Sequence, residues 1–289
     1  MIHKILLLVD DFPYSMPDQS KLCIHTITNK PWSLPELVEQ YSKTGIRGVS
    51  VWQYSVEELG PRESGRLIRD HGMEVVSYVR GGFFPYSSQQ KREEAIVHNR
   101  KMIDQAAELG APMLVLVCGA EPGQTLEESR KQIQDGIEQL LPQAEQNQVQ
   151  LTIEPLHPMY ADTRSAINTL GQANDMAEAI DSSLVGVALD VYHTWWDPHL
   201  ETEIHRCSRN GNLSAFHICD WKVPTRDMLN DRGLMGEGCI KLDQIKQWVL
   251  NAGFDGFHEV EIFSDLYWAQ DQKTFLDNII ESYQIYWEQ

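Results

Sequence analysis

The sequence LVGVALDV, residues 184–191, is a short valine-rich apolar run with an aspartate, Asp190, next to its end. Runs of this kind are typical of parallel strands that are buried on both faces. Similar runs recur along the chain, each separated from the next by polar loops and helix-length segments. We expect strands at residues 22–28, 46–52, 73–79, 111–118, 149–155, 184–191, 213–220 and 257–263.

The segments between these strands carry helix-start signals. Capping boxes begin at Ser33, Ser55 and Thr125, and another helix is expected to begin within residues 87–90. Eight strand–helix units over about 250 residues predict an α/β fold, a single (β/α)8 TIM barrel. An open doubly wound sheet is the alternative, but no glycine-rich dinucleotide-binding motif follows an early strand. We assign residues 21–289 to one barrel domain and leave residues 1–20 as an N-terminal extension without an assigned role.

Composition and charge restrict the class of partner. The 289-residue chain has a net charge of −18, which disfavours nucleic-acid binding, because that binding depends on Lys and Arg neutralising phosphates. Five scattered cysteines without a CxxC motif are expected to be reduced thiols of a cytoplasmic protein. No segment has the length and apolarity of a signal peptide or a membrane span.

Four polar residues stand at the carboxyl ends of the last four predicted strands: Glu154, Asp190, His217 and Glu261. In a barrel these ends meet on one face, where catalytic groups lie. Three converging carboxylates would repel one another, and a divalent cation is the simplest remedy. Oxygen and nitrogen donors of this kind suit Mn²⁺, Mg²⁺, Co²⁺ or Zn²⁺.

This E…DxxH…H…E pattern, with the strings LDVYHTWWDP and EVEIFS around it, resembles the xylose-isomerase-like TIM barrels. The resemblance covers roughly residues 22–285 and extends to sugar phosphate isomerases and epimerases, keto-sugar 3-epimerases, and inosose dehydratases and isomerases. It implies that the four residues bind one metal ion, with Mn²⁺ favoured. It also implies that Glu154 and Glu261 form the acid/base pair, while Asp190 and His217 are ligands only.

Other residues are expected to contact the substrate. His193 matches the histidine of the family's DxxH motif, and Arg232 resembles the arginine of a DRG-like loop, with Lys222 and Arg226 competing for that role. Three further candidates are His157, Trp196 and His25.

The resemblance implies a metal-dependent isomerase or epimerase of a keto-sugar or keto-cyclitol, acting through an enediolate. A keto-sugar dehydratase or lyase that uses the same metal site is the alternative. A DNA phosphodiesterase is disfavoured by the charge, and a non-catalytic sugar-binding subunit would not need the full ligand set. The resemblance also implies a homo-oligomer, a dimer or tetramer.

Overall fold

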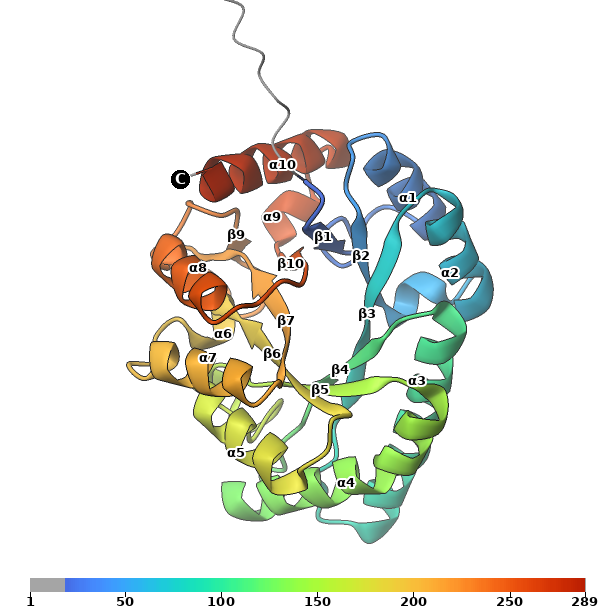
Figure 1. Cartoon of the computed structure of the whole chain (residues 1–289), viewed down its shortest axis with the longest axis vertical. Helices are drawn as coiled ribbons and strands as arrows, with labels where there is room; N and C mark the ends of the chain where they lie inside the picture. The colour runs from blue at the N-terminus through green and yellow to red at the C-terminus, as the bar shows by residue number, and fades with distance from the viewer. Residues whose placement is uncertain (1–18, 289) are drawn as a thin grey trace, which may run out of the picture.

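The computed structural model describes residues 19–288, and residues 1–18 of the predicted N-terminal extension lie outside this range. Eight parallel strands close into a barrel in the order β1-β10-β7-β6-β5-β4-β3-β2, with helices around them (Figure 1). The predicted (β/α)8 barrel is therefore confirmed. The barrel strands are β1 (Leu22–His25), β2 (Gly48–Trp52), β3 (Glu74–Gly82), β4 (Met113–Val117), β5 (Gln150–Glu154), β6 (Val185–Asp190), β7 (Leu213–Ile218) and β10 (His258–Val260).

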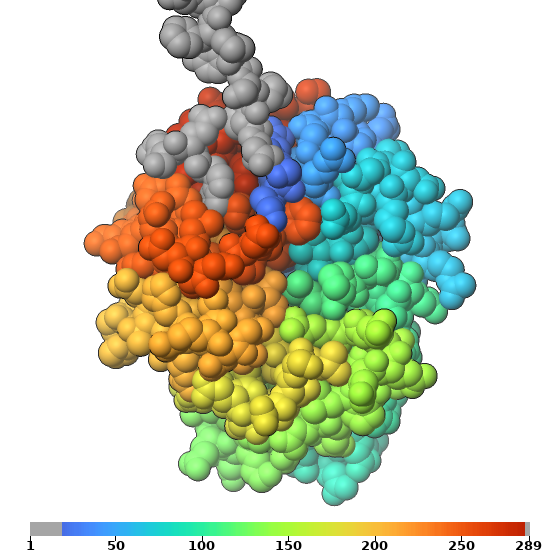
Figure 2. Space-filling view, in the orientation of Figure 1, coloured from blue at the N-terminus to red at the C-terminus, as the bar shows by residue number. Residues whose placement is uncertain are grey.

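The strands alternate with helices, so the units follow one another around the molecule in chain order (Figure 2). The capping boxes at Ser33 and Thr125 are both present. The α-helices are α1 (Leu34–Ser42), α2 (Pro61–Asp70), α3 (Gln89–Leu109), α4 (Leu126–Asn147), α5 (Leu170–Ile180), α6 (Val191–Thr194), α7 (Leu200–Arg209), α8 (Leu242–Asn251), α9 (Asp265–Trp268) and α10 (Gln272–Glu288). Two 3₁₀ helices, η1 (Gln53–Val56) and η2 (Pro158–Tyr160), and a small antiparallel pair, β8 (Asp220–Trp221) with β9 (Arg232–Gly233), complete the described elements.

The helix predicted to start at Ser55 does not form there. The Ser55 hydroxyl donates to Thr26 Oγ1 at 2.9 Å, and the segment is the 3₁₀ helix η1. The helix α2 begins later, at Pro61, after Gly60 with its positive φ of 77°. Proline is well suited to the first turn of a helix because its missing N–H would be unpaired there anyway.

The strand register brings the polar strand ends to one level. Asp190 pairs with His217 across β6 and β7, and His217 pairs with Glu259 across β7 and β10. Val117 at the end of β4 pairs with Glu154 at the end of β5. The carboxyl ends of β5, β6, β7 and β10 therefore deliver their polar side chains to the same end of the barrel.

All five cysteines lie in the described part of the chain and are free thiols, four of them buried and Cys239 exposed. Between residues 19 and 288, no helix combines the length and the apolar character needed to cross a membrane.

Candidate metal centre

The four predicted strand-end residues meet inside the barrel mouth. Glu154, Asp190, His217 and Glu261 are all buried, and one ligand atom of each lies within 4.8 Å of the ligand atoms of the others. His217 Nδ1 lies 2.9 Å from Glu154 Oε1. A metal ion bound by nitrogen and oxygen at about 2.0–2.2 Å holds its ligand atoms at such separations.

The local fold fixes the orientation of Asp190. This residue ends β6 and is the N-cap of α6, where its Oδ1 accepts a hydrogen bond from the Tyr192 N–H at 2.7 Å. Its other oxygen, Oδ2, faces the cluster. Burial raises the pKa of Asp190 to about 6, although the Arg232 guanidinium opposes this effect. The carboxylate is therefore costly to keep charged without a cation beside it.

Arg232 reaches the cluster from β9. Its Nη1 lies 2.9 Å from both Asp190 Oδ2 and Glu261 Oε2, and its Nη2 lies 3.2 Å from His193 Nε2. Its guanidinium carbon stands 4.5 Å from the ring centroid of Tyr192. The guanidinium thus presents its donors to the same carboxylates that a metal ion would use.

The two competitors of Arg232 face elsewhere. Arg226 pairs with Asp231, and Lys222 lies 3.2 Å from the Tyr267 hydroxyl and 3.5 Å from Glu237 Oε2. Of the three basic residues Lys222, Arg226 and Arg232, it is therefore Arg232 that enters the candidate site.

The floor of the site is a buried network of side chains, and the sequence predicts only some of its members. His25 Nδ1 lies 3.0 Å from Glu261 Oε1, and His25 Nε2 lies 3.2 Å from Glu259 Oε2. Ser50 donates to Glu259 Oε2 at 2.5 Å, and His217 Nε2 lies 3.7 Å from the same oxygen. Glu259 was not predicted, yet the two-residue period of a strand places it on the same inward face as Glu261.

The carboxylates around His217 control its charge. Burial disfavours the imidazolium, but Glu259 and Glu154 outweigh burial and raise the pKa of His217 to about 10. Only a deprotonated ring nitrogen can bind a metal ion, and a bound cation would favour that form.

A small cavity of about 20 Å³ lies against the cluster, between the strand ends and the loop that joins β8 to β9. Of the predicted substrate contacts, His193 and Arg232 line it. A cavity of this size holds about one water molecule. The lining residues are Trp52, Val117, Glu154, Leu156, Tyr160, Arg164, His193, Leu229, Arg232, Glu261 and Phe263.

The structure places the other predicted substrate contacts outside the cavity lining. His25 is fully buried beneath Glu261. The Trp196 indole N–H donates to the His193 carbonyl at 2.9 Å, and its ring meets His157 at a centroid distance of 5.7 Å. His157 also packs on Trp221 at 5.2 Å. Trp196 thus contacts the cavity-lining His193 through its backbone, and His157 packs against Trp196.

The donor set fits a divalent cation. Three carboxylates and one imidazole from four different strand ends are the hard and borderline ligands that Mn²⁺, Mg²⁺, Co²⁺ and Zn²⁺ accept. His25, His217 and Glu259 form a second close group below, but it shares His217, and its His25 and Glu259 side chains are paired with each other.

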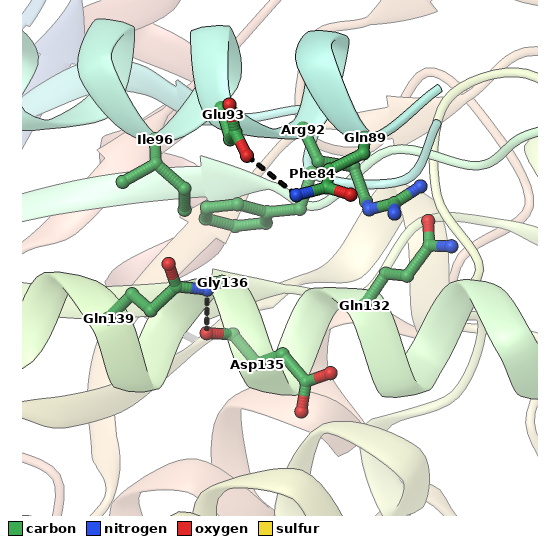
Figure 3. A pocket seen from close by; sticks show the side chains of 9 residues that line it. All are labelled: Phe84, Gln89, Arg92, Glu93, Ile96, Gln132, Asp135, Gly136 and Gln139. Carbon is green, nitrogen blue, oxygen red and sulfur yellow. Dashed lines mark hydrogen bonds between the residues drawn. The ribbon is translucent and has the colours of Figure 1, made fainter. Parts of the chain in front are cut away.

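A second cleft, of about 250 Å³, lies outside the barrel between α3 and α4 (Figure 3). The Phe84 ring stands between the two helices, and the surrounding side chains include Arg92, Glu93, Gln132 and Asp135. This cleft shares no residue with the cluster of carboxylates and histidines.

Comparisons with known proteins agree with this fold. The chain is 27% identical over 242 residues to a 3-dehydroshikimate dehydratase of Pseudomonas aeruginosa, an alignment that covers 81% of this chain and 36% of that protein. The chain therefore spans about a third of the length of that relative.

Among solved structures, protein SMc04130 of Sinorhizobium meliloti is 43% identical, with a TM-score of 0.89 and coverage of 92% of this chain and 98% of that one. The IolI protein with a bound zinc atom is 20% identical, with a TM-score of 0.82 and coverage of 92% and 97%. The 3-keto-D-glucoside 4-epimerase YcjR of E. coli is 17% identical, with a TM-score of 0.74 and coverage of 93% and 100%. The last two likenesses show the shared fold alone.

The family model described as "Xylose isomerase-like TIM barrel" matches residues 38–279, which include all four strand-end residues of the cluster. With its closed eight-stranded barrel, the chain belongs to the xylose isomerase-like TIM barrel family.

Proposed function

We propose that this protein is a divalent-metal-dependent isomerase or epimerase of a keto-sugar or keto-cyclitol. The observation that carries the proposal is the buried convergence of Glu154, Asp190, His217 and Glu261 within 4.8 Å. A metal ion held there would polarise a substrate carbonyl and acidify the neighbouring C–H. The four residues are its proposed ligands, and Mn²⁺ is the ion that we favour.

Glu154 and Glu261 are the proposed acid/base pair. They come from β5 and from just beyond β10, two strands that lie on either side of the β6–β7 pair in the barrel. A substrate between them presents one face to each carboxylate. One glutamate, as the carboxylate, would remove the proton next to the carbonyl. The other, as the protonated acid, would donate its own proton to the opposite face or to the neighbouring carbon.

Two further residues would hold the substrate oxygens. Arg232 offers guanidinium donors, and His193 lines the cavity beside it. Burial lowers the pKa of His193 well below its usual value, and the Arg232 charge adds to this effect. His193 is therefore neutral near pH 7 and binds a hydroxyl as a hydrogen-bond partner rather than as a cation.

A keto-sugar dehydratase or lyase is the second candidate function. The 3-dehydroshikimate dehydratase relative supports it. Both reactions begin with removal of a proton next to a carbonyl, so the same two glutamates serve either. Product analysis separates them, because elimination releases water and forms a C=C bond, whereas epimerisation leaves the mass of the substrate unchanged. We further propose that the protein is a homo-oligomer in the cytoplasm and that it binds no nucleic acid.

The first experiment measures the metal content of the purified chain by elemental analysis after incubation with Mn²⁺. We expect about one ion per wild-type chain and almost none in His217→Ala. His71→Ala is the matched control, because His71 is exposed at the end of α2. Wild-type protein without metal would refute the metal mechanism and leave the non-catalytic sugar-binding role.

A positive metal result leads to incubation of candidate keto-sugars in D₂O. Incorporation of deuterium next to the carbonyl by the wild type, and its loss in Glu154→Gln and Glu261→Gln, is the expected result. Each substitution should lower the exchange rate by about 10²–10⁴-fold, the usual contribution of a positioned acid or base.

A further inference from the structure

Two arginines stand at the carboxyl end of the barrel next to the candidate site. Arg80 lies near the end of β3, and its guanidinium carbon is 4.5 Å from the ring centroid of Phe83 and 6.0 Å from that of Trp52. Arg164 lines the cavity itself, between β5 and α5, with its guanidinium 5.7 Å from the Tyr160 ring. Both side chains are half-buried.

The backbone holds both arginines in place. The Arg164 carbonyl accepts a hydrogen bond from the Gly119 N–H at 2.8 Å, and its own N–H donates to the Tyr160 carbonyl at 2.9 Å. The end of β3 is fixed by Asn99, whose side chain accepts from the Gly82 N–H at 2.7 Å and donates to the Gly82 carbonyl at 2.8 Å. The backbone at or next to both arginines is thus held by the scaffold, and each guanidinium lies against an aromatic ring.

Neither guanidinium has an ion pair or a hydrogen bond within residues 19–288. The chain has 42 acidic residues against 24 Lys and Arg, so acidic partners are plentiful. Other arginines use them: Arg206 contacts Asp175, Glu178 and Glu203.

The arginines also repel each other. Burial and the charge of Arg164 lower the pKa of Arg80 to about 10, while Glu154 opposes the shift. The negative charges of Glu154 and the neighbouring carboxylates are balanced without Arg80 and Arg164. His217 already contacts Glu154, Arg232 contacts Asp190 and Glu261, and His25 contacts Glu261. Arg164 lines the cavity, and Arg80 lies against Trp52 of the same lining. Two arginines so placed, without an acidic partner in the described part of the chain, are arranged for an external anion.

We infer that Arg80 and Arg164 form an oxyanion subsite of the candidate active site, and that the substrate carries a carboxylate or phosphate group remote from its keto group. This inference rests on the proposed function. A guanidinium binds both kinds of oxyanion through paired N–H donors, and aromatic faces such as those of Phe83 and Tyr160 keep its plane in position. The subsite would select acidic keto-sugars or keto-cyclitols over neutral ones.

The test is calorimetric binding of three probes to the Mn²⁺-incubated full chain: D-fructose, 5-keto-D-gluconate and D-fructose 6-phosphate. We expect at least one anionic probe to bind about tenfold or more tightly than D-fructose, since a charged hydrogen bond is worth that much. Arg80→Gln and Arg164→Gln should each lower the affinity for the preferred anion by about tenfold or more, so that its advantage over D-fructose in the same variant is lost. Arg209→Gln is the matched control, because Arg209 is exposed at the end of α7.

The anionic probe that shows the larger preference identifies a carboxylate or a phosphate. An equal affinity for all three probes, no detectable binding of either anion, or a preference that survives in both variants would overturn the inference. Metal content measured on the same samples separates this failure from that of the proposed function. A wild type that holds the ion but shows no anion preference keeps the metal centre and loses the subsite.

Discussion

Glu259 contacts three other side chains in the floor of the site. Its carboxylate contacts His25, Ser50 and His217, and it is 1% exposed. A histidine that binds a metal through one nitrogen is usually oriented by a carboxylate or carbonyl at the other. Glu259 therefore positions His217 through Nε2, while His217 Nδ1 faces Glu154.

Replacing this carboxylate should weaken metal binding without removing a proposed ligand. We expect Glu259→Gln to raise the dissociation constant of Mn²⁺ by about 10–100-fold, because the amide no longer orients the imidazole as a charged acceptor. Titration of the chelator-treated protein with Mn²⁺ measures this. Glu201→Gln, at an exposed position of α7, is the control, and an unchanged constant in Glu259→Gln would show that Glu259 has no positioning role.

The sequence predicts which polar residues stand at the strand ends, but it does not predict the surroundings of each side chain. Glu154, Asp190, His217 and Glu261 each follow an apolar run, and the structure brings all four together. Glu259 could have been predicted from strand periodicity. The unpaired state of Arg80 and Arg164 could not, because it depends on which acids the closed barrel places near them.

At the scale of elements, the fit of α2 against α3 depends on Gly65. A Cβ at this position would lie 1.9 Å from the carbonyl oxygen of Leu109, the last residue of α3. That oxygen belongs to the backbone and cannot turn away. The close approach of the two helices therefore requires a residue without a side chain.

We expect Gly65→Ala to lower the free energy of unfolding by about 1–3 kcal/mol, since overpacking outweighs the better helix propensity of alanine. Gly171→Ala in α5 is the matched control, because its nearest contact is the end of the Glu203 side chain at 3.3 Å, which can move. This variant should be as stable as the wild type or up to about 1 kcal/mol more stable. Urea unfolding measures both, and equal stabilities of the two variants would contradict the packing argument.

Helix starts show where local sequence signals succeed and where they fail. The capping boxes at Ser33 and Thr125 form, and each hydroxyl bonds to the glutamate of its own box, Glu36 or Glu128. Ser55 carries the same signal, but its hydroxyl is used by Thr26 of the neighbouring unit. A tertiary contact of this kind involves residues 29 positions apart and leaves no local trace in the sequence.

At the scale of the whole molecule, the barrel itself was the most predictable feature. Eight apolar runs, each followed by a helix-length segment, match the eight strand–helix units of a closed barrel. Strand lengths were less accurate. The first strand ends at His25 rather than at residue 28, and β3 extends to Gly82.

A metal ion that binds only the folded chain must stabilise the whole barrel. With Mn²⁺ at 100 times its dissociation constant, the gain is about 2.7 kcal/mol, which corresponds to roughly 5–10 °C in Tm for a domain of this size. We expect this rise in a calorimetric scan of the wild type and its absence in His217→Ala. A rise of the same size in both proteins would place the stabilising ion elsewhere.

The loop between β8 and β9 lies over the cavity, and Met228 is one of the residues that hold it there. The Met228 carbonyl accepts hydrogen bonds from the Tyr160 hydroxyl at 2.5 Å and the Tyr192 hydroxyl at 3.1 Å. Leu229, the next residue, lines the cavity of about 20 Å³, which is too small for a sugar. We therefore expect the two hydrogen bonds to Met228 to break before a substrate enters or a product leaves.

If loop opening limits kcat, the rate of the chemical step has little effect on kcat. When opening sets the pace, a substrate that carries deuterium on the reacting carbon turns over almost as fast as one that carries hydrogen. We expect a suppressed isotope effect on kcat in the wild type and a larger one in the double variant Tyr160→Phe, Tyr192→Phe, whose loop lacks both hydrogen bonds to Met228. The same isotope effect in both would mean that proton transfer already limits the wild type. If the double variant shows the larger isotope effect, the two phenolic hydroxyls on the Met228 carbonyl set how often the site opens. They do not set which substrate bond breaks.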